Sequence, residues 1–160
     1  MEFVLLADAP AALGKVAGWY YNKWGRKHKD VSLQNIAAKL TRSDNREQVP
    51  LLMLVRHLGQ IVAAGELKWR EMPQFEQYPV WMGGIYVDKH WRGLGIASHL
   101  VAALIEKAKT LGITELYLQT EDLSGGIYAK SGFKPIHQLE SNGKQVVVMR
   151  LQIDKLTTTL

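Results

Sequence analysis

Apolar residues along this chain alternate between two spacings, which predict an alternation of strands and helices. Short runs rich in β-branched and aromatic residues predict strands at residues 2–7, 51–56, 61–70, 81–87, 115–120, 133–140 and 145–153. Apolar residues spaced three and four apart predict helices after Asp8, after Ser32, over 97–111 and, briefly, over 126–130. The order of these elements predicts an α/β (α+β) fold, a mixed sheet with helices on both faces.

The ends of the helices carry recognisable signals. Asp8 is predicted to cap the first helix, with Pro10 in its first turn. Its buried face is predicted to consist of Leu13, Val16, Ala17, Tyr20 and Trp24. Gly112 stands where the long helix over 97–111 should end. Turns at Leu58–Gln60 and Asn142–Gly143 predict two antiparallel hairpins.

Composition narrows the class of protein. A chain of 160 residues with 47% hydrophobic content predicts one domain, residues 1–160, with a sizeable core. The absence of cysteine excludes disulfides, a thiol nucleophile and cysteine-based metal sites, and it is compatible with the cytoplasmic location that we expect. No apolar stretch reaches the roughly 18 residues of a membrane helix, so no membrane association is expected.

The net charge of +5 suits an anionic ligand and would also suit nucleic acid. The basic cluster at Arg26–Lys29 is short and has no interleaved aromatic residues. We interpret it as a solvated loop and expect no nucleic-acid partner.

The segment Arg92–Ala97, which reads RGLGIA, joins the strand at 81–87 to the long helix. Glycine there lets backbone approach an anion closely, and the first turn of the helix presents unsatisfied N–H groups. A dinucleotide fingerprint does not fit, because Ser98 stands where its third glycine belongs, and a P-loop lacks its G-K-[ST]. A purely structural strand-to-helix turn stays open as the alternative.

Two motifs in this order resemble those of the GCN5-related N-acetyltransferase (GNAT) family. Arg92, Gly95 and Ala97 match the R-x-x-G-x-G/A loop, and Tyr128, Gly132 and Phe133 in IYAKSGF match a Y-x-x-x-G-F segment. The resemblance implies a centrally splayed sheet of six to seven strands. It also implies acetyl-CoA as co-substrate, with no metal, and N-acetyl transfer to an amine.

The resemblance also assigns residues to acetyl-CoA. The pyrophosphate and pantetheine would be bound by the end of the central strand and the loop after it: Ile85, Tyr86, Val87, Arg92, Gly93, Leu94, Gly95, Ile96, Ala97 and Ser98. Gly83 and Gly84, side by side in that strand, predict either a close backbone approach by the ligand or a bulge that only bends the sheet. In many relatives an asparagine upstream of the tyrosine contacts the cofactor, and this chain has none in TEDLSGG.

Acyl transfer needs a general acid for the leaving thiolate and a base for the attacking amine. By resemblance Tyr128 is the acid, and packing on a short helix is the alternative. If the strand at 61–69 alternates, Val62, Ala64, Glu66 and Lys68 share one face, and Glu66 is either the base or the partner of an exposed ion pair. Glu121 and Asp122 are weaker alternatives for the base. A backbone N–H near Val87 is a candidate oxyanion donor.

The acceptor is the least defined part. Trp69, Glu71, Tyr78 and Trp81 either line an acceptor cleft or belong to the core. We expect a small-molecule amine or a peptide N-terminus as acceptor, and a homodimer stays open. The histidines lack the spacing of metal ligands. A non-catalytic acyl-CoA-binding sensor is the alternative to an enzyme.

Overall fold

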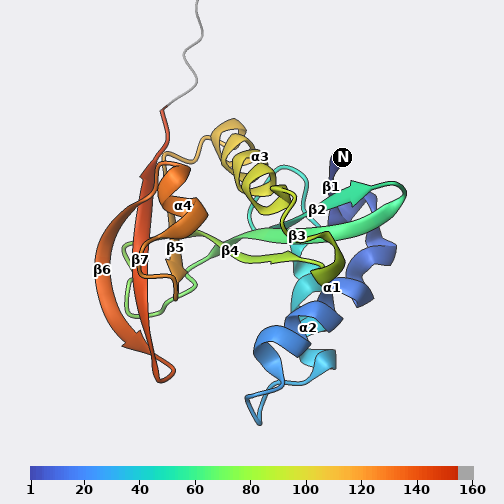
Figure 1. The fold of residues 1–160 in the computed structure, drawn as a ribbon, viewed down its shortest axis with the longest axis horizontal. Helices are drawn as coiled ribbons and strands as arrows, with labels where there is room; N and C mark the ends of the chain where they lie inside the picture. Colours follow the sequence, from blue (N-terminus) through green and yellow to red (C-terminus); the bar gives the residue numbers. More distant parts are fainter. Residues whose placement is uncertain (155–160) are drawn as a thin grey trace, which may run out of the picture.

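A computed structural model describes residues 1–154, which form one seven-stranded sheet with helices on both faces (Figure 1). The strand order is β1-β2-β3-β4-β5-β7-β6. The strands are β1 (Glu2–Leu5), β2 (Leu51–His57), β3 (Gln60–Trp69), β4 (Val80–Val87), β5 (Glu115–Thr120), β6 (Lys134–Ser141) and β7 (Lys144–Gln152). The helices are α1 (Leu13–Tyr20), α2 (Leu33–Leu40), α3 (Ile96–Thr110) and α4 (Gly126–Lys130). This confirms the predicted mixed sheet.

The sheet divides at its centre. Strand β4 pairs with β5 in parallel, through the single register pair Trp81 and Tyr117, whereas all other neighbouring strands are antiparallel and paired along most of their length. From this point the two strands diverge, so one half of the sheet carries β1–β4 and the other carries β5–β7 (Figure 1). Within residues 1–154, the edge of β4 that faces β5 therefore has no strand partner after Trp81, as the predicted splay requires.

Helix α3 packs across both halves of the sheet. Its buried residues Leu100, Val101 and Leu104 belong to a cluster that includes Leu51 of β2 and Met149 of β7. The spacing of these residues gives α3 one continuous apolar face, as predicted. On the opposite face, α1 and α2 cover the β1–β4 half, while the loop after β3 covers the β5–β7 half around Trp81 and Tyr117.

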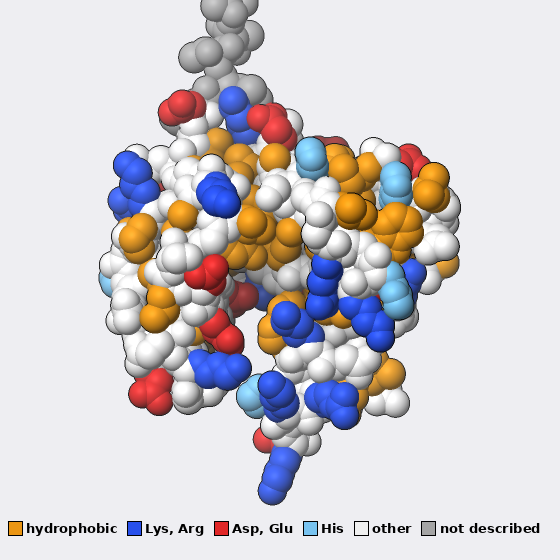
Figure 2. All heavy atoms as spheres, viewed as in Figure 1, with side chains coloured by type: hydrophobic (Ala, Val, Ile, Leu, Met, Phe, Trp, Pro, Cys, Tyr) orange, Lys and Arg blue, Asp and Glu red, His pale blue; other side chains and the backbone are white. Residues whose placement is uncertain are grey.

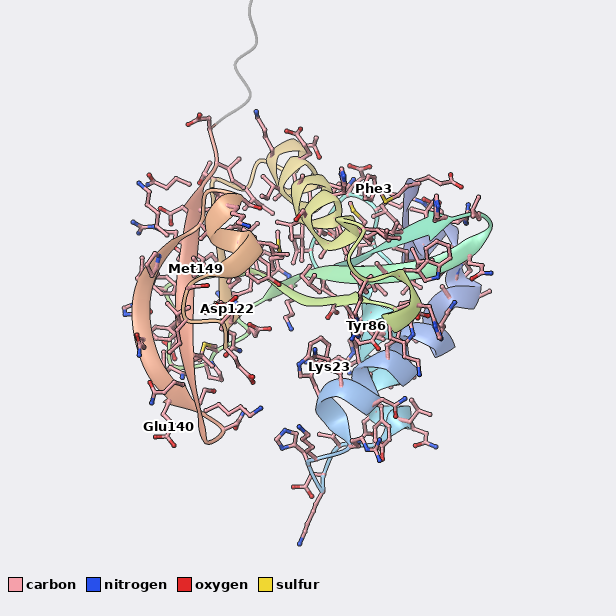
Figure 3. The ribbon with its side chains drawn as sticks, in the orientation of Figure 1. Phe3, Lys23, Tyr86, Asp122, Glu140 and Met149 are labelled. Carbon is pink, nitrogen blue, oxygen red and sulfur yellow. The ribbon has the colours of Figure 1, made fainter. Side chains whose placement is uncertain are left out.

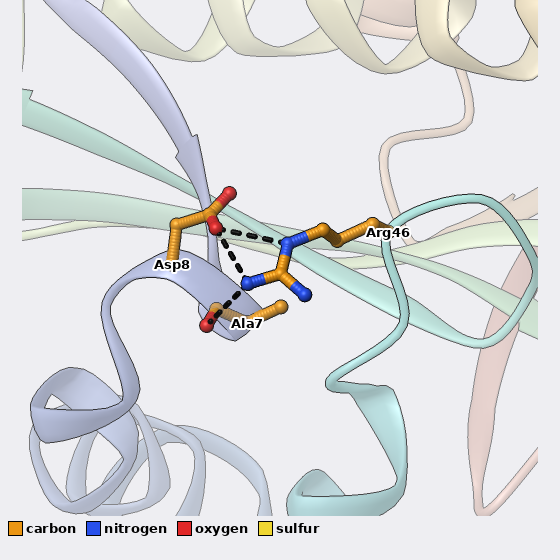
Figure 4. A network of polar contacts seen from close by, with 3 residues as sticks. All are labelled: Ala7, Asp8 and Arg46. Atoms are coloured by element: carbon orange, nitrogen blue, oxygen red, sulfur yellow. Dashed lines mark hydrogen bonds and ion pairs between the residues drawn. The ribbon is translucent and has the colours of Figure 1, made fainter.

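The N-terminal segment differs from its prediction. Strand β1 ends at Leu5, two short 3₁₀ turns follow, and α1 begins only at Leu13, with no side-chain cap. Asp8 does not cap a helix, because its carboxylate accepts from Arg46 Nε at 2.9 Å and lies 2.8 Å from Nη2 (Figure 4). The same guanidinium donates to the carbonyl of Ala7 at 3.3 Å. Asp8 thus fastens the loop before β2 to the end of β1.

The other local signals are mostly confirmed. Ser32 caps α2 by accepting from the N–H of Asn35 at 3.0 Å. The two hairpins turn through Leu58–Gly59 and Asn142–Gly143, all with positive φ. Helix α1 passes at Tyr21–Gly25 into a π-helical turn, in which Trp24 is 41% exposed rather than fully buried.

Candidate active site

The surface is hollowed between the two halves of the molecule, on the side where β4 and β5 part (Figure 2). Acidic side chains lie on the rim formed by the β5–β7 half, and lysine and arginine side chains gather on the rim formed by α1 and α2. Figure 3 shows Lys23 on the second rim, Tyr86 of β4 next to it, and Asp122, just after β5, on the first rim. We call this hollow the cleft.

Two adjacent glycines of β4 shape one wall of the cleft. Gly84 has φ +59°, and the register between β3 and β4 shifts between Ala64 and Glu66, so the predicted bulge is present. A Cβ on Gly84 would lie 2.6 Å from the hydroxyl of Tyr20 and 2.7 Å from Oε2 of Glu66. The close approach at Gly84 is therefore made by side chains of the protein itself.

The hydroxyl of Tyr20, on α1, donates to the carbonyl oxygen of Gly84 at 2.6 Å. Burial, with the nearby Glu66 carboxylate as second cause, raises the pKa of Tyr20 well above its ordinary value. Tyr20 is therefore a neutral donor that holds the bulge against α1.

Glu66 faces the same space from β3. Burial is the main cause that raises its pKa, and Glu71 adds to the effect, while Lys68 and Lys39 oppose it. A carboxylate whose pKa is raised is a better proton acceptor than an exposed carboxylate, because it binds a proton more tightly. Glu66 does not form the exposed ion pair that was its second predicted role. Glu66 is not exposed, and Lys68 pairs with Glu71 instead.

The strand alternation that placed Glu66 is only partly correct. Ala64 faces α1 and α2, but Val62 packs into the cluster beneath α3. The register between β2 and β3 shifts between Val55 and Arg56, and this irregularity breaks the alternation at Val62.

A second charged group lies beside Gly83. Lys68 Nζ is 2.6 Å from Oε1 of Glu71, and Oε2 of Glu71 accepts from Nε2 of Gln119 at 3.1 Å. A Cβ on Gly83 would lie 2.6 Å from Cε of Lys68 and 2.7 Å from Oε1 of Glu71. Burial alone would lower the pKa of Lys68, but Glu71 and Glu66 raise it overall. Lys68 therefore keeps its proton at neutral pH.

Tyr128 is on α4, half-buried against the cluster beneath α3. Burial, followed by the charge of Glu71, raises the pKa of Tyr128 to about 12. Its hydroxyl therefore keeps its proton at neutral pH. Glu121 and Asp122 do not join this group: Glu121 pairs at the surface with Lys144, and hydrogen bonds from Ser124 lower the pKa of Asp122.

The loop before α3 presents backbone to solvent. Gly93 and Gly95 have φ of +80° and +78°, and a Cβ at either position would find no atom within 4 Å. The first intrahelical donor is the N–H of His99, which bonds to the carbonyl of Gly95 at 3.2 Å. The N–H groups of Ile96, Ala97 and Ser98 precede it and have no intrahelical acceptor.

The predicted cofactor residues divide by what their side chains do. Ile96 is buried in the core, and Ile85 and Val87 pack against it, so these three offer only backbone groups. Arg92 Nε donates to the carbonyl of Val87 at 3.0 Å, and its guanidinium lies 5.4 Å from the centre of the Tyr86 ring. Arg92 thus links the loop to the end of β4.

Of the four residues left open between an acceptor cleft and the core, three lie outside the cleft. Trp81 and Tyr78 belong to the buried aromatic cluster with Tyr117, in which the rings of Tyr78 and Tyr117 stack 4.1 Å apart. Trp69 is 50% exposed and donates to the carbonyl of Val49 at 3.0 Å. Only Glu71 reaches the charged group, because it follows the end of β3 where the chain turns back across the sheet.

Comparison with protein-family models gives a match to the acetyltransferase (GNAT) family over residues 14–133, well over half of the chain. The chain belongs to this acetyltransferase family. The match spans the region from α1 to Phe133 and so includes both motifs of this GNAT protein. No curated protein matches it.

Solved structures similar to this GNAT protein confirm its fold. Aminoglycoside 6′-acetyltransferase type Ii has a TM-score of 0.74 at 18% identity, covering 98% of this chain and 100% of that one. A ribosomal-protein-alanine N-acetyltransferase from Brucella melitensis has a TM-score of 0.71 at 21% identity, covering 96% and 100%. A putative acetyltransferase from Salmonella typhimurium, solved with its cofactor acetyl-CoA, has a TM-score of 0.73 at 18% identity, covering 99% and 97%.

Residues 1–154 of this GNAT protein contain neither a candidate membrane span nor a candidate metal-binding group. In this part of the chain no helix has the length and apolar character to span a bilayer. Over the same residues, no group of three or more His, Cys, Asp or Glu side chains is arranged to hold a metal ion.

Sequence reasoning missed Tyr20 and Gln119. Tyr20 has the helical spacing of a core residue, and its hydroxyl bond reaches a carbonyl 64 positions away. The one signal in the sequence was the Gly83–Gly84 pair. Adjacent glycines in a strand indicate that other atoms lie close to the backbone, but they do not identify which residues those atoms belong to.

Proposed function

We propose that this protein is an acetyl-CoA-dependent N-acetyltransferase that transfers an acetyl group directly to a primary amine of a small molecule or a peptide N-terminus. One observation carries the proposal: the edge of β4 that β5 leaves unpaired leads to the N-terminus of α3, and Glu66 on β3 and Tyr128 on α4 are both within reach of the Glu71 charge beside that edge. Membership of the acetyltransferase family supports it.

The residues present fit acetyl-CoA. The N-terminus of α3 offers three N–H groups and the positive end of the helix dipole, and Gly93 and Gly95 leave the space before it open, which suits a pyrophosphate. Along β4, Asp88 N–H bonds to Val62 of β3, so the N–H of Val87 points to the open edge. That edge suits the amide groups of a pantetheine arm.

When bound, acetyl-CoA supplies the thioester that is attacked. Glu66 takes the proton from the attacking amine, directly or through one water, because its raised pKa keeps it basic in the buried site. The N–H of Val87 donates to the oxygen that gains negative charge. Tyr128, protonated at neutral pH, gives its proton to the departing sulfur.

The reaction is tested with a panel of small amines and peptides, acetyl-CoA and a measurement of free thiol release. We expect turnover with at least one primary amine, and a loss of kcat of roughly 100-fold or more in Tyr128→Phe. Tyr117→Phe is the matched control, because burial raises the pKa of Tyr117 to about 12 as well and its hydroxyl bonds to Glu115. Acetyl-CoA binding with no turnover on any amine would refute the proposal in favour of a non-catalytic sensor.

The pyrophosphate site is tested separately by calorimetry. Gly95→Asp places a carboxylate in front of the α3 N-terminus and should abolish acetyl-CoA binding. Gly95→Asn has nearly the same shape and the same tolerance of positive φ, but no charge, and should retain more affinity. Equal affinity of both variants and the wild type would contradict the assignment.

A further inference from the structure

Glu71 has no role in the reaction steps proposed above, yet its carboxylate makes two close contacts. It is in the loop after β3, outside any strand, and its side chain is only 16% exposed. A carboxylate in such surroundings is costly unless it is paired and hydrogen-bonded, and both conditions are met. One oxygen contacts Lys68 at 2.6 Å and the other accepts from Gln119 at 3.1 Å.

These two contacts come from opposite sides of the cleft. Lys68 is on β3, in the half of the sheet that carries β1–β4, and Gln119 is on β5, in the other half. Strands β4 and β5 pair only at Trp81 and Tyr117, so the Glu71 carboxylate joins the two halves beyond the point where their strands part. Gly83 makes this possible, because a side chain there would occupy the position of the ion pair.

We propose that Glu71 is a positioning residue: its carboxylate ties the β3 wall of the cleft to the β5 wall through Lys68 and Gln119, and its negative charge acts on Glu66, which lies against the neighbouring Gly84. The inference rests on the proposed function, since Glu66 is the base of that reaction.

The ionisable groups around Glu66 come from four elements. Tyr20 of α1 is neutral, Lys39 of α2 and Lys68 of β3 favour the ionised carboxylate, and Glu71 of the following loop disfavours it. The same Glu71 charge helps to raise the pKa of Tyr128. One carboxylate therefore keeps the base more basic and the acid more firmly protonated.

Glu71→Gln tests this role, because it removes the charge and nearly preserves the shape. We expect kcat/KM for the amine to fall between about tenfold and 100-fold. We also expect the acidic limb of its pH profile to move to lower pH, because Glu66 loses a neighbouring negative charge. Glu71→Asp keeps the charge and should keep the acidic limb near its wild-type position. Glu76→Gln, an exposed change in the same loop, is the control and should alter neither quantity.

Gln119→Met separates the tie from the charge. It removes the amide donor at similar side-chain length, so it should lower kcat/KM and leave the acidic limb in place. If Glu71→Gln unfolds the protein, Gln119→Met still tests the tie and Glu71→Asp the charge.

A second readout does not depend on turnover. The carboxyl ¹³C resonance of Glu66, followed by NMR against pH, should titrate at lower pH in Glu71→Gln than in the wild type. If Glu66 titrates identically in both, the proposal is overturned. If the titration moves but the wild type acetylates no amine, the proposed reaction is refuted while the influence of Glu71 on Glu66 stands.

Discussion

Replacing Gly84 by alanine tests whether the protein's own side chains fill the space beside the β4 bulge. The new Cβ would lie 2.6 Å from the hydroxyl of Tyr20 and 2.7 Å from Oε2 of Glu66, well inside van der Waals contact. The positive φ of +59° adds backbone strain of about 1–2 kcal/mol for a residue with a Cβ. Overpacking of a filled site costs about 1–3 kcal/mol more. We therefore expect Gly84→Ala to lose about 2–5 kcal/mol of unfolding free energy.

The measurement is equilibrium urea unfolding, with Gly59→Ala as the matched control. Gly59 has φ +77° in the β2–β3 turn, and a Cβ there would find no atom within 4 Å. The unfolding free energy that Gly59→Ala loses should therefore reflect backbone strain alone, about 1–2 kcal/mol. Equal losses in the two variants would refute the crowding that we infer at Gly84.

Tyr20→Phe adds a further check on the same site. It leaves the carbonyl of Gly84 without its donor, at a cost of about 1–3 kcal/mol. In the double variant the hydroxyl oxygen no longer opposes the new methyl group. The losses from Gly84→Ala and Tyr20→Phe should therefore sum to more than the loss of the double variant.

The remaining predictions concern stability. Asp8→Asn should cost less than about 1 kcal/mol in urea unfolding, because its pair with Arg46 is exposed (52% and 59%), and a larger loss would show a structural role that the contacts do not. Leu104→Ala should cost about 2–5 kcal/mol by the same measurement, since α3 holds it fully buried across both halves of the sheet, and a loss below 1 kcal/mol would contradict that packing. The pKa of Glu66 is raised in the folded state, so the folded protein binds this proton more tightly than the unfolded chain does. The stability that this proton contributes is present at low pH and is lost as pH rises from the ordinary glutamate range through the raised pKa. The unfolding free energy should therefore depend less on pH over this window in Glu66→Gln than in the wild type. Identical pH profiles of the two proteins would refute this prediction.

Much of the fold follows from local signals in the sequence. The apolar spacing along α3, the Ser32 cap and the two hairpin turns each depend on residues close together in the chain, and each appears as predicted. Asp8 carries an equally plausible cap signal, but a distant partner, Arg46, takes its carboxylate. A local rule fails there because a contact between remote segments competes with it.

The candidate site was less accessible to such reasoning. Glu66 was placed by strand alternation, which held from Ala64 onward although a register shift displaced Val62. For Trp81 the sequence leaves cleft and core open, and the residue is core because a loop after β3 covers that face of the sheet. The meeting of Tyr20 with Gly84 depends on how α1 crosses β4, and no pattern within either element encodes it.

The layer beneath α3 and the layer on the opposite face join the two halves of the sheet in different ways. Beneath α3 one apolar cluster runs without a break from β2 to β7. On the other face the apolar cluster of α1 ends at Ala64 and the aromatic cluster begins at Met72, with Glu66, Lys68 and Glu71 between them. Separating apolar surfaces is costly, whereas polar contacts exchange with water at small net cost. We therefore expect any change in the angle between the halves to pivot on α3 and to alter the width of the cleft on the α1 side.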